Sequence, residues 1–243
     1  YLIPPRKNMT IFHGKLLLSD QNPGRSLNLP IDIFMRSLAK DQEKNAIGII
    51  LSGTGSDGTL GIRAIKEYGG MTMVQDDRSA KFDGMPRSSI STGKVDYILP
   101  APQLSVELFN YINHPLISKS EIIEQQISED GNQLSKIISI LRDEMGVDFS
   151  LYKDTTVLRR LEKRISINRY SKIEDYVNFL SGNQREIHVL FNDLLIGVTR
   201  FFRDEEAFEK IKKEVLPIIL KPTISGTPLR LWSTGCSTGE EPY

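Results

Sequence analysis

The sequence predicts an α/β domain with a parallel sheet, then a small all-α domain, then the first strand and turn of a second α/β unit. Three observations predict this order. An uninterrupted apolar run over 46–51 is typical of a strand that is buried on both faces of a parallel sheet. From residue 133 onward, the apolar residues recur at helical spacing. A further strand pattern over 229–232 then leads into a glycine-rich turn over 233–241.

Strand and helix patterns alternate in the first part of the chain. The expected strands cover 1–3, 9–12, 15–18, 46–51, 71–75 and 95–99, with a hairpin turn at His13-Gly14. The expected helices start at Leu29-Pro30 and cover 59–68 and 104–112. Their predicted buried residues are Ile31, Phe34, Met35 and Leu38, then Leu60, Ala64 and Ile65, then Leu104, Leu108 and Tyr111. Strand, helix and strand in this order predict a right-handed crossover between parallel strands.

The later part of the chain reads as helices. Residues 133–145 and 155–167 show helical spacing, and two capping boxes are expected, Ser171 with Glu174 and Asn183 with Glu186. Asp204 is expected to cap one more helix. The predicted domains are therefore 1–113, a polar linker over 114–132, a helical domain over 133–203 and a last unit over 204–243.

Composition narrows the class of protein. Lys plus Arg and Asp plus Glu both number 31, so net charge gives no argument for nucleic acid or for an anionic membrane. Apolar runs are shorter than the ~20 residues that span a bilayer. One cysteine and three scattered histidines predict no disulfide, no metal site and a reducing, cytoplasmic location. The chain starts without Met and stops at a turn, so we expect it to be a fragment cut at both ends.

The stretch AIGIILSGTGSDG over 46–58 is the first of two places where a strand breaks into a glycine-rich turn. Gly53, Gly55 and Gly58 let the backbone turn tightly and leave Asp57 at the carboxyl end of the strand. Ligands and catalytic groups collect at that edge in open α/β sheets. Asp57 is therefore either a reacting carboxylate or a helix cap, and spacing alone leaves both interpretations open.

The second turn is STGCSTGEEPY over 233–243, where Glu240 and Glu241 stand at an expected helix start. Neither turn contains Gly-Lys-Ser/Thr, which argues against a phosphate-binding P-loop. Acids at a helix start either stabilise the helix dipole or bind a cationic or hydroxylated small molecule.

The helix over 155–167 carries a basic cluster. Arg160, Lys163 and Arg164 share one face, with Arg159 and Arg169 nearby. This face is either solvated or the docking site of an acidic protein or substrate. Aromatic residues of the kind that stack on bases are not interleaved with these cations, so nucleic acid is disfavoured as a partner.

Two parts of the chain resemble known families. IGIILSGTGSDGTLGIRAIKEYGG, VQDDRSAKFDGMPRSSISTG and VDYILP resemble the catalytic domain of chemotaxis protein-glutamate methylesterases (CheB), over about residues 1–112. From residue 133 on, the helical pattern, VTRFFRDEEAF and GCSTGEEPY resemble the chemotaxis receptor methyltransferases (CheR). The succession is similar to fused CheB–CheR proteins, which are often followed by sensor and kinase modules.

The CheB resemblance implies a Ser-His-Asp triad with Asp57 at the aspartate position. Asp57 would orient a histidine and stabilise its cation while the serine attacks a γ-glutamyl methyl ester. Residues 84–87 match a loop that shapes the cleft near that site. The family's serine and histidine would precede Tyr1, and His13 is assigned to the hairpin turn, so the chain as given is expected not to hydrolyse esters.

The CheR resemblance implies that S-adenosylmethionine binds to a doubly wound domain. Thr199, Arg203 and Glu241 match positions that contact this cofactor, and the turn starting at Gly235 would let the backbone pass close to it. Gly197 stands where family members often have Asn, which removes one side-chain contact.

Arg160 and Arg164 match basic positions that, by the resemblance, face the acidic receptor helix or approach the active site. The implied activity is that of a bifunctional, cytoplasmic chemotaxis enzyme. It would hydrolyse receptor glutamate methyl esters and methylate receptor glutamates, with a methyl-accepting receptor or receptor-like signalling protein as partner, and without nucleic acid or membrane insertion. Two alternatives stay open: a non-catalytic scaffold that binds receptor or kinase partners, and an α/β protein with no site at Asp57.

Overall fold

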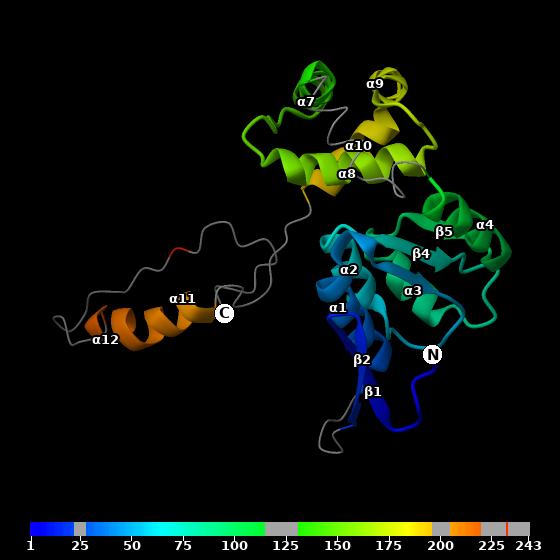
Figure 1. The fold of residues 1–243 in the computed structure, drawn as a ribbon, viewed down its shortest axis with the longest axis vertical. Helices are drawn as coiled ribbons and strands as arrows, with labels where there is room; N and C mark the ends of the chain where they lie inside the picture. The colour runs from blue at the N-terminus through cyan, green and yellow to red at the C-terminus, as the bar shows by residue number, and fades with distance from the viewer. Residues whose placement is uncertain (22–27, 115–130, 196–204, 220–231, 233–243) are drawn as a thin grey trace. The chain divides into compact units, whose positions relative to one another are not determined.

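The computed structural model describes residues 1–21, 28–114, 131–195, 205–219 and Trp232. The chain forms two compact units, residues 1–196 and 197–243. The first unit holds both the α/β part and a group of helices (Figure 1).

A three-stranded parallel sheet is the centre of the α/β part. Its strands are β3 (Ile47–Ile50), β4 (Met71–Gln75) and β5 (Tyr97–Leu99), in the order β3-β4-β5. The helices around it are α1 (Pro30–Gln42), α2 (Thr59–Glu67), α3 (Gly84–Ile90) and α4 (Ala101–Ile112), and a 3-10 turn, η1 (Glu43–Asn45), follows α1. The predicted parallel strands and all three predicted helices are confirmed.

Helices cover both faces of this sheet. One core cluster joins the sheet to α1, α2 and α3 through Met35, Ile62, Ile65, Ile50 and Val74, among others. A second cluster on the other face packs Met71 and Met73 of β4 against Leu104 and Tyr111 of α4. All five residues of β4 are buried, because β4 is the middle strand and has helices on both sides.

Some details of the predicted burial were wrong. Leu60 is 47% exposed, whereas Gly61 and Ile62 of the same helix are buried. In α1, the buried residues include Asp32 and Ala39, which apolar spacing did not indicate.

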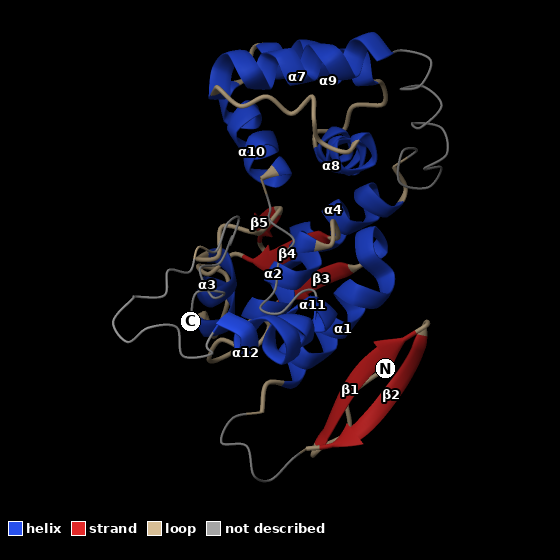
Figure 2. Cartoon of the chain, turned by 90° about the vertical axis from the view of Figure 1, so that its left-hand side faces the viewer, coloured by secondary structure: helices blue, strands red, loops and turns tan. Residues whose placement is uncertain are grey.

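A separate antiparallel hairpin, β1 (Lys7–Phe12) with β2 (Lys15–Asp20), packs beside α1 (Figure 2). The predicted turn at His13-Gly14 is confirmed: both backbone amides donate to the carboxylate of Asp41. The predicted strand over 1–3 is wrong, since these residues adopt no regular structure and the side chains of Tyr1 and Leu2 are exposed.

The all-α part consists of α7 (Gly131–Met145), α8 (Asp154–Ile167), α9 (Ile173–Ser181) and α10 (Gln184–Leu194). Its core is one cluster that includes Ile137, Leu161, Tyr176 and Leu190. The predicted capping box at Ser171 is wrong, because α9 begins two residues later and Lys172 occupies the cap position. At α10, Asn183 does accept the backbone amide of Glu186 at 3.0 Å.

The second unit contributes α11 (Glu205–Lys210), a π-helical turn η2 (Ile211–Val215) and α12 (Leu216–Ile219). The expected cap at Asp204 and most of the expected strand 229–232 lie outside the described residues. Among the helices that are described, none combines the length and the apolar character needed to cross a membrane.

Candidate functional site

Asp57 lies in the loop that connects β3 to α2. The loop leaves the sheet at Leu51 and reaches the first turn of α2 at Thr59. Gly55 and Gly58 have φ angles of +83° and +95°, which side chains other than glycine rarely adopt. The loop is therefore glycine-rich because its turn demands it, and Asp57 is held at the sheet edge where the sequence predicted it.

The carboxylate of Asp57 caps helix α1. Its Oδ2 accepts the backbone amide of Ile31 at 3.0 Å, and its Oδ1 accepts that of Asp32 at 2.9 Å. The residue at the cap position of α1 is Leu29, which has no side-chain oxygen to offer. Asp57 thus supplies, from a distant part of the sequence, the cap that α1 lacks. The helix-cap interpretation of Asp57 is confirmed.

A second aspartate, in α1, accepts a backbone amide at the start of α2. Asp32, in the first turn of α1, accepts the backbone amide of Gly61 in α2 at 2.7 Å. The start of α1 therefore receives a carboxylate from the loop before α2, and the start of α2 receives one from α1. Burial raises the pKa of Asp32, the amide of Gly61 lowers it, and the negative charge of Asp57 raises it again. The charge of Asp57 is therefore close enough to influence the ionisation of Asp32.

The segment over 84–87 contacts the Asp57 loop, but as a helix. We expected a loop there, whereas Gly84 begins α3, with Pro86 in its first turn. The amide of Met85 donates to the carbonyl of Gly53 at 2.9 Å, and the amide of Gly53 donates to the carbonyl of Phe82 at 2.9 Å. A Cβ on Gly84 would lie 2.8 Å from the amide nitrogen of Gly55, so this approach requires glycine. The first turn of α3 thus packs against the loop that carries Asp57.

The basic face of α8 does not lie in solvent. Arg160 and Lys163 are 6% and 3% exposed, and both contact the α/β part of the chain. Arg164 forms two hydrogen bonds with the carboxylate of Glu186 in α10, from Nε at 2.8 Å and from Nη2 at 2.6 Å. The interpretation of this face as solvated is wrong, and its partners here are groups of the same chain. A role of Arg160 and Arg164 in binding a receptor stays a prediction.

The acidic partners of this face were not predicted. Asp96 and Asp193 are fully and nearly fully buried at the side chain. A signal existed for Asp96, which stands between Val95 and Tyr97 in an otherwise apolar strand pattern. Asp193 carried no such signal, because its burial depends on the packing of α10.

The predicted cofactor residues Thr199, Arg203, Gly235 and Glu241 lie outside the described residues, as does Gly197. Their role stays a prediction. In the parts of the chain that the structure describes, no cluster of His, Cys, Asp and Glu is arranged to hold a metal ion.

Three family models match consecutive stretches of the chain. The CheB methylesterase model matches residues 1–108, the CheR methyltransferase all-alpha domain matches 132–195, and the CheR SAM binding domain matches 197–243. The chain has the fused CheB–CheR architecture. The parallel sheet with Asp57 therefore belongs to the CheB part, and α7 to α10 form the CheR all-alpha part.

Individual relatives match either the whole chain or one part. A 104.1 kDa protein of Rhodobacter capsulatus, described as uncharacterized, is 35% identical over 263 residues, which cover 100% of this chain and 28% of that protein. A protein-glutamate methylesterase/protein-glutamine glutaminase of Photorhabdus laumondii is 32% identical, over 46% of this chain and 33% of its own. A chemotaxis protein methyltransferase of Borreliella burgdorferi is 28% identical, over 46% of this chain and 41% of its own. The chain thus spans less than half of each of these relatives.

Proposed function

We propose that this chain is part of a bifunctional enzyme that hydrolyses methyl esters on receptor glutamates and methylates receptor glutamates with S-adenosylmethionine. One observation carries the proposal: CheB and CheR segments follow each other in a single chain. Relatives that match each part separately are named for the two opposing reactions. In this proposal both activities would act on the same carboxyl group, and the fusion would bring them into one protein.

In the hydrolytic reaction, Asp57 would orient the catalytic histidine and stabilise its cationic form. The geometry supports this role. Each carboxylate oxygen of Asp57 accepts one backbone amide, which leaves a lone pair on each for an imidazole N–H. Because two amides fix the carboxylate, it is held in one orientation before a histidine approaches. The helix-cap role and the catalytic role are therefore compatible.

In the methylation reaction, S-adenosylmethionine would supply an electrophilic methyl group on a sulfonium. The chemistry of the predicted contact residues suits this cofactor. The guanidinium of Arg203 matches a carboxylate, and the carboxylate of Glu241 matches an ammonium or a hydroxyl group. Holding the receptor glutamate close to the methyl group would supply much of the catalysis, since the leaving group is already good.

The cofactor assignment is tested by calorimetry on the complete parent protein. Arg203→Ala is expected to weaken binding of S-adenosylmethionine at least ten-fold, since a charge-assisted pair is lost. Lys210→Ala, which changes charge equally in the nearby helix α11, is the control and should bind normally. Unchanged affinity in Arg203→Ala would remove this residue from the site.

The ester assignment is tested on the same parent with a methylated receptor peptide. Asp57→Asn is expected to reduce hydrolysis by a factor of about 10⁴, the loss seen when a triad aspartate is replaced. Full activity in this variant would exclude Asp57 from the mechanism and favour the scaffold alternative for the CheB part.

A further inference from the structure

We propose that α8 uses one basic face for two partners that exclude each other: the CheB part of this chain and the acidic receptor segment. This inference rests on the proposed function, which supplies the receptor. In the state described here, the CheB part occupies the face. Receptor binding through Arg160 then requires that the CheR helices separate from the CheB part.

The contact begins at the end of helix α2. Nη1 and Nη2 of Arg160 donate to the carbonyls of Lys66 and Glu67, both at 2.8 Å. Nζ of Lys163 donates to the carbonyl of Gly70. The last carbonyls of a helix have no partner within the helix and carry partial negative charge. Cations of α8 thus satisfy the C-terminus of α2 and the turn after it.

A buried ion cluster lies beneath these bonds. Nζ of Lys66 lies 2.6 Å from Asp96 and 2.8 Å from Asp193, and Nζ of Lys163 lies 2.7 Å from the other oxygen of Asp96. All four side chains are at most 6% exposed. Lys66 and Asp96 come from the CheB part, whereas Lys163 and Asp193 come from the CheR helices α8 and α10. The cluster therefore forms when the two parts meet.

Ionisation in the cluster is uneven. Burial opposes the charge on Asp96, but Lys163 and Lys66 outweigh it and hold the pKa of Asp96 well below its usual value. Burial lowers the pKa of Lys163 to about 8, although Asp96 acts in the opposite direction. Lys163 has fewer carboxylate partners than Lys66. It pairs with Asp96, which it shares with Lys66, whereas Lys66 also pairs with Asp193.

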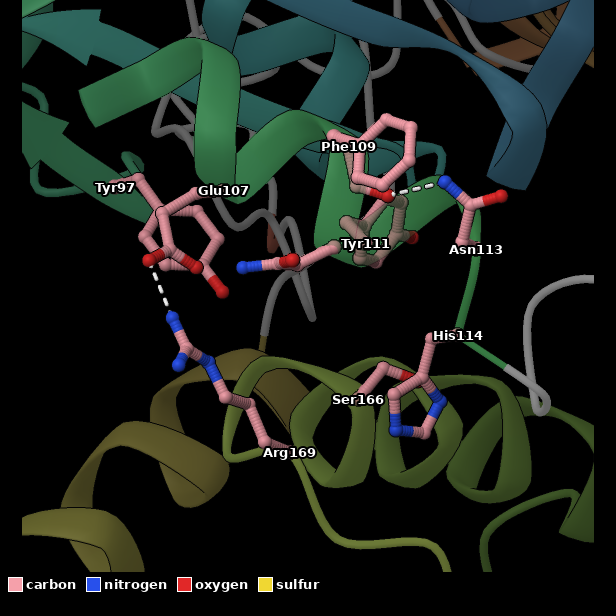
Figure 3. A pocket seen from close by; sticks show the side chains of 9 residues that line it. Tyr97, Glu107, Phe109, Tyr111, Asn113, His114, Ser166 and Arg169 are labelled. Atoms are coloured by element: carbon pink, nitrogen blue, oxygen red, sulfur yellow. Dashed lines mark hydrogen bonds and ion pairs between the residues drawn. The ribbon is translucent and has the colours of Figure 1, made fainter. Parts of the chain in front are cut away.

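On the side of α4, two further bonds join the CheB and CheR parts at the edge of the contact. The guanidinium of Arg169 binds the carboxylate of Glu107, and the hydroxyl of Tyr97 donates to the carbonyl of Ile167 at 3.4 Å. Figure 3 shows these side chains around a cavity of about 330 Å³, lined by α4 on one side and by the end of α8 on the other. Ile167 also packs on the apolar cluster that covers the sheet. The contact therefore combines a charged centre with an apolar and polar rim.

This arrangement can be displaced by a competing acid. Buried ion pairs roughly balance Coulomb attraction against the cost of desolvation, so they contribute little net stability. One oxygen of Asp193 is buried without a hydrogen-bond partner, which adds a desolvation cost to the docked state. An acidic segment would thus replace the backbone carbonyls at Arg160 and the carboxylate of Asp96 at Lys163 with its own carboxylates.

The test uses the complete parent protein and a synthetic amphipathic peptide with glutamates along one helical face. Lys66→Met removes the lysine that joins Asp96 to Asp193 and should open the contact. Because this variant loses a positive charge, electrostatics alone would weaken its binding of an acidic peptide. Tighter binding would therefore have to come from the opened contact. Lys40→Met, at an exposed position of α1, is the charge-matched control. Peptide affinity is measured by fluorescence anisotropy, and opening by acylation of Lys163 detected by mass spectrometry.

The proposal expects Lys163 to be protected in the wild type and in Lys40→Met, and to react in Lys66→Met. It also expects Lys66→Met to bind the peptide about five-fold more tightly. In this variant, the face of α8 no longer has to be released from its contact with the CheB part before the peptide binds. If Lys66→Met fails to fold, Glu107→Gln opens the rim and is measured in the same way.

Three results would overturn the proposal. Rapid acylation of Lys163 in the wild type would show that the contact does not form. Continued protection in both opening variants would show that these pairs do not hold it. Exposed Lys163 with unchanged peptide affinity would show that the two partners do not exclude each other. If no form binds the peptide while Lys163 is protected, the contact between the two parts stands, but the receptor role in the proposed function fails and the proposed competition fails with it.

Discussion

Replacing Asp57 by Asn should destabilise the fold as well as affect catalysis. The carboxylate of Asp57 holds the amides of Ile31 and Asp32 at the start of α1. Asn keeps one oxygen acceptor, and its amide group would face the second N–H as another donor. One charge-assisted bond, worth roughly 1.5–3 kcal/mol, is lost, and the other becomes a neutral bond. Loss of charge at the helix dipole adds a few tenths of a kcal/mol.

One effect opposes this loss. The charge of Asp57 raises the pKa of Asp32, so its removal relieves a repulsion between the two carboxylates. We therefore expect a net destabilisation of about 2 kcal/mol. For a domain of about 200 residues this lowers the melting temperature by roughly 4–8 °C.

The assay is thermal and urea unfolding of this chain, followed by circular dichroism. Asp20→Asn, which removes a carboxylate from an exposed surface ion pair, is the control and should change stability by less than about 1 kcal/mol. A loss below about 0.5 kcal/mol in Asp57→Asn would refute the argument that this carboxylate stabilises α1. The ester hydrolysis of the parent variant should be measured well below its melting temperature, so that lost activity is not lost folding.

Three further predictions concern other parts of the structure. Gly84→Ala should destabilise by about 1–3 kcal/mol, because its methyl group would meet the backbone of Gly55, and urea unfolding measures this. Arg164→Met should cost roughly 3–5 kcal/mol by the same measurement, because it leaves the carboxylate of Glu186 buried without its cation. Because its pKa is depressed in the folded protein, ionised Asp96 contributes its full stability above its usual pKa of 3.8, and the wild type should lose this contribution progressively as the pH falls below that value. Unfolding free energies measured across pH 2–5 should therefore fall more steeply for the wild type than for Asp96→Asn.

Matched variants separate these effects from general damage. A Cβ on Gly182 would make an ordinary contact with the carbonyl oxygen of Phe179 at 4.0 Å, so Gly182→Ala should be neutral or stabilising. Arg159→Met, on the same helix as Arg164, removes an exposed cation 3.8 Å from Glu43 and should cost less than about 1 kcal/mol. Equal losses in Arg159→Met and Arg164→Met would contradict the assignment of a buried ion pair to the latter.

The order of elements could be predicted because it depends on local patterns. The apolar run over 46–51 indicates a buried strand, and from it the parallel sheet could be predicted. The helical spacing after residue 133 indicates helices with one buried face, and these are α7 to α10. The position of Asp57 beside a strand end was likewise accessible, since glycines mark the turn. Its hydrogen-bond partners were not, because they come from a helix that lies about 25 residues earlier in the chain.

The fate of the basic face of α8 could not be predicted from sequence. Helical spacing shows that Arg160, Lys163 and Arg164 share a face. Spacing alone does not tell whether water or another part of the protein covers these cations. Its burial depends on Asp96 and on the carbonyls at the end of α2, which come from distant parts of the sequence. The helix α3 was missed for a related reason: its seven residues are too few to show a periodic pattern.

The composition of the ion cluster has a consequence for the separation of the CheB and CheR parts. Each part brings one lysine and one aspartate to the cluster, so the cluster residues of each part carry no net charge when the parts are apart. Separation of the two parts would therefore expose a balanced pair of charges on each side rather than a lone ion. Lys66 and Asp96 of the CheB part can keep their mutual ion pair in that state, since they already lie 2.6 Å apart.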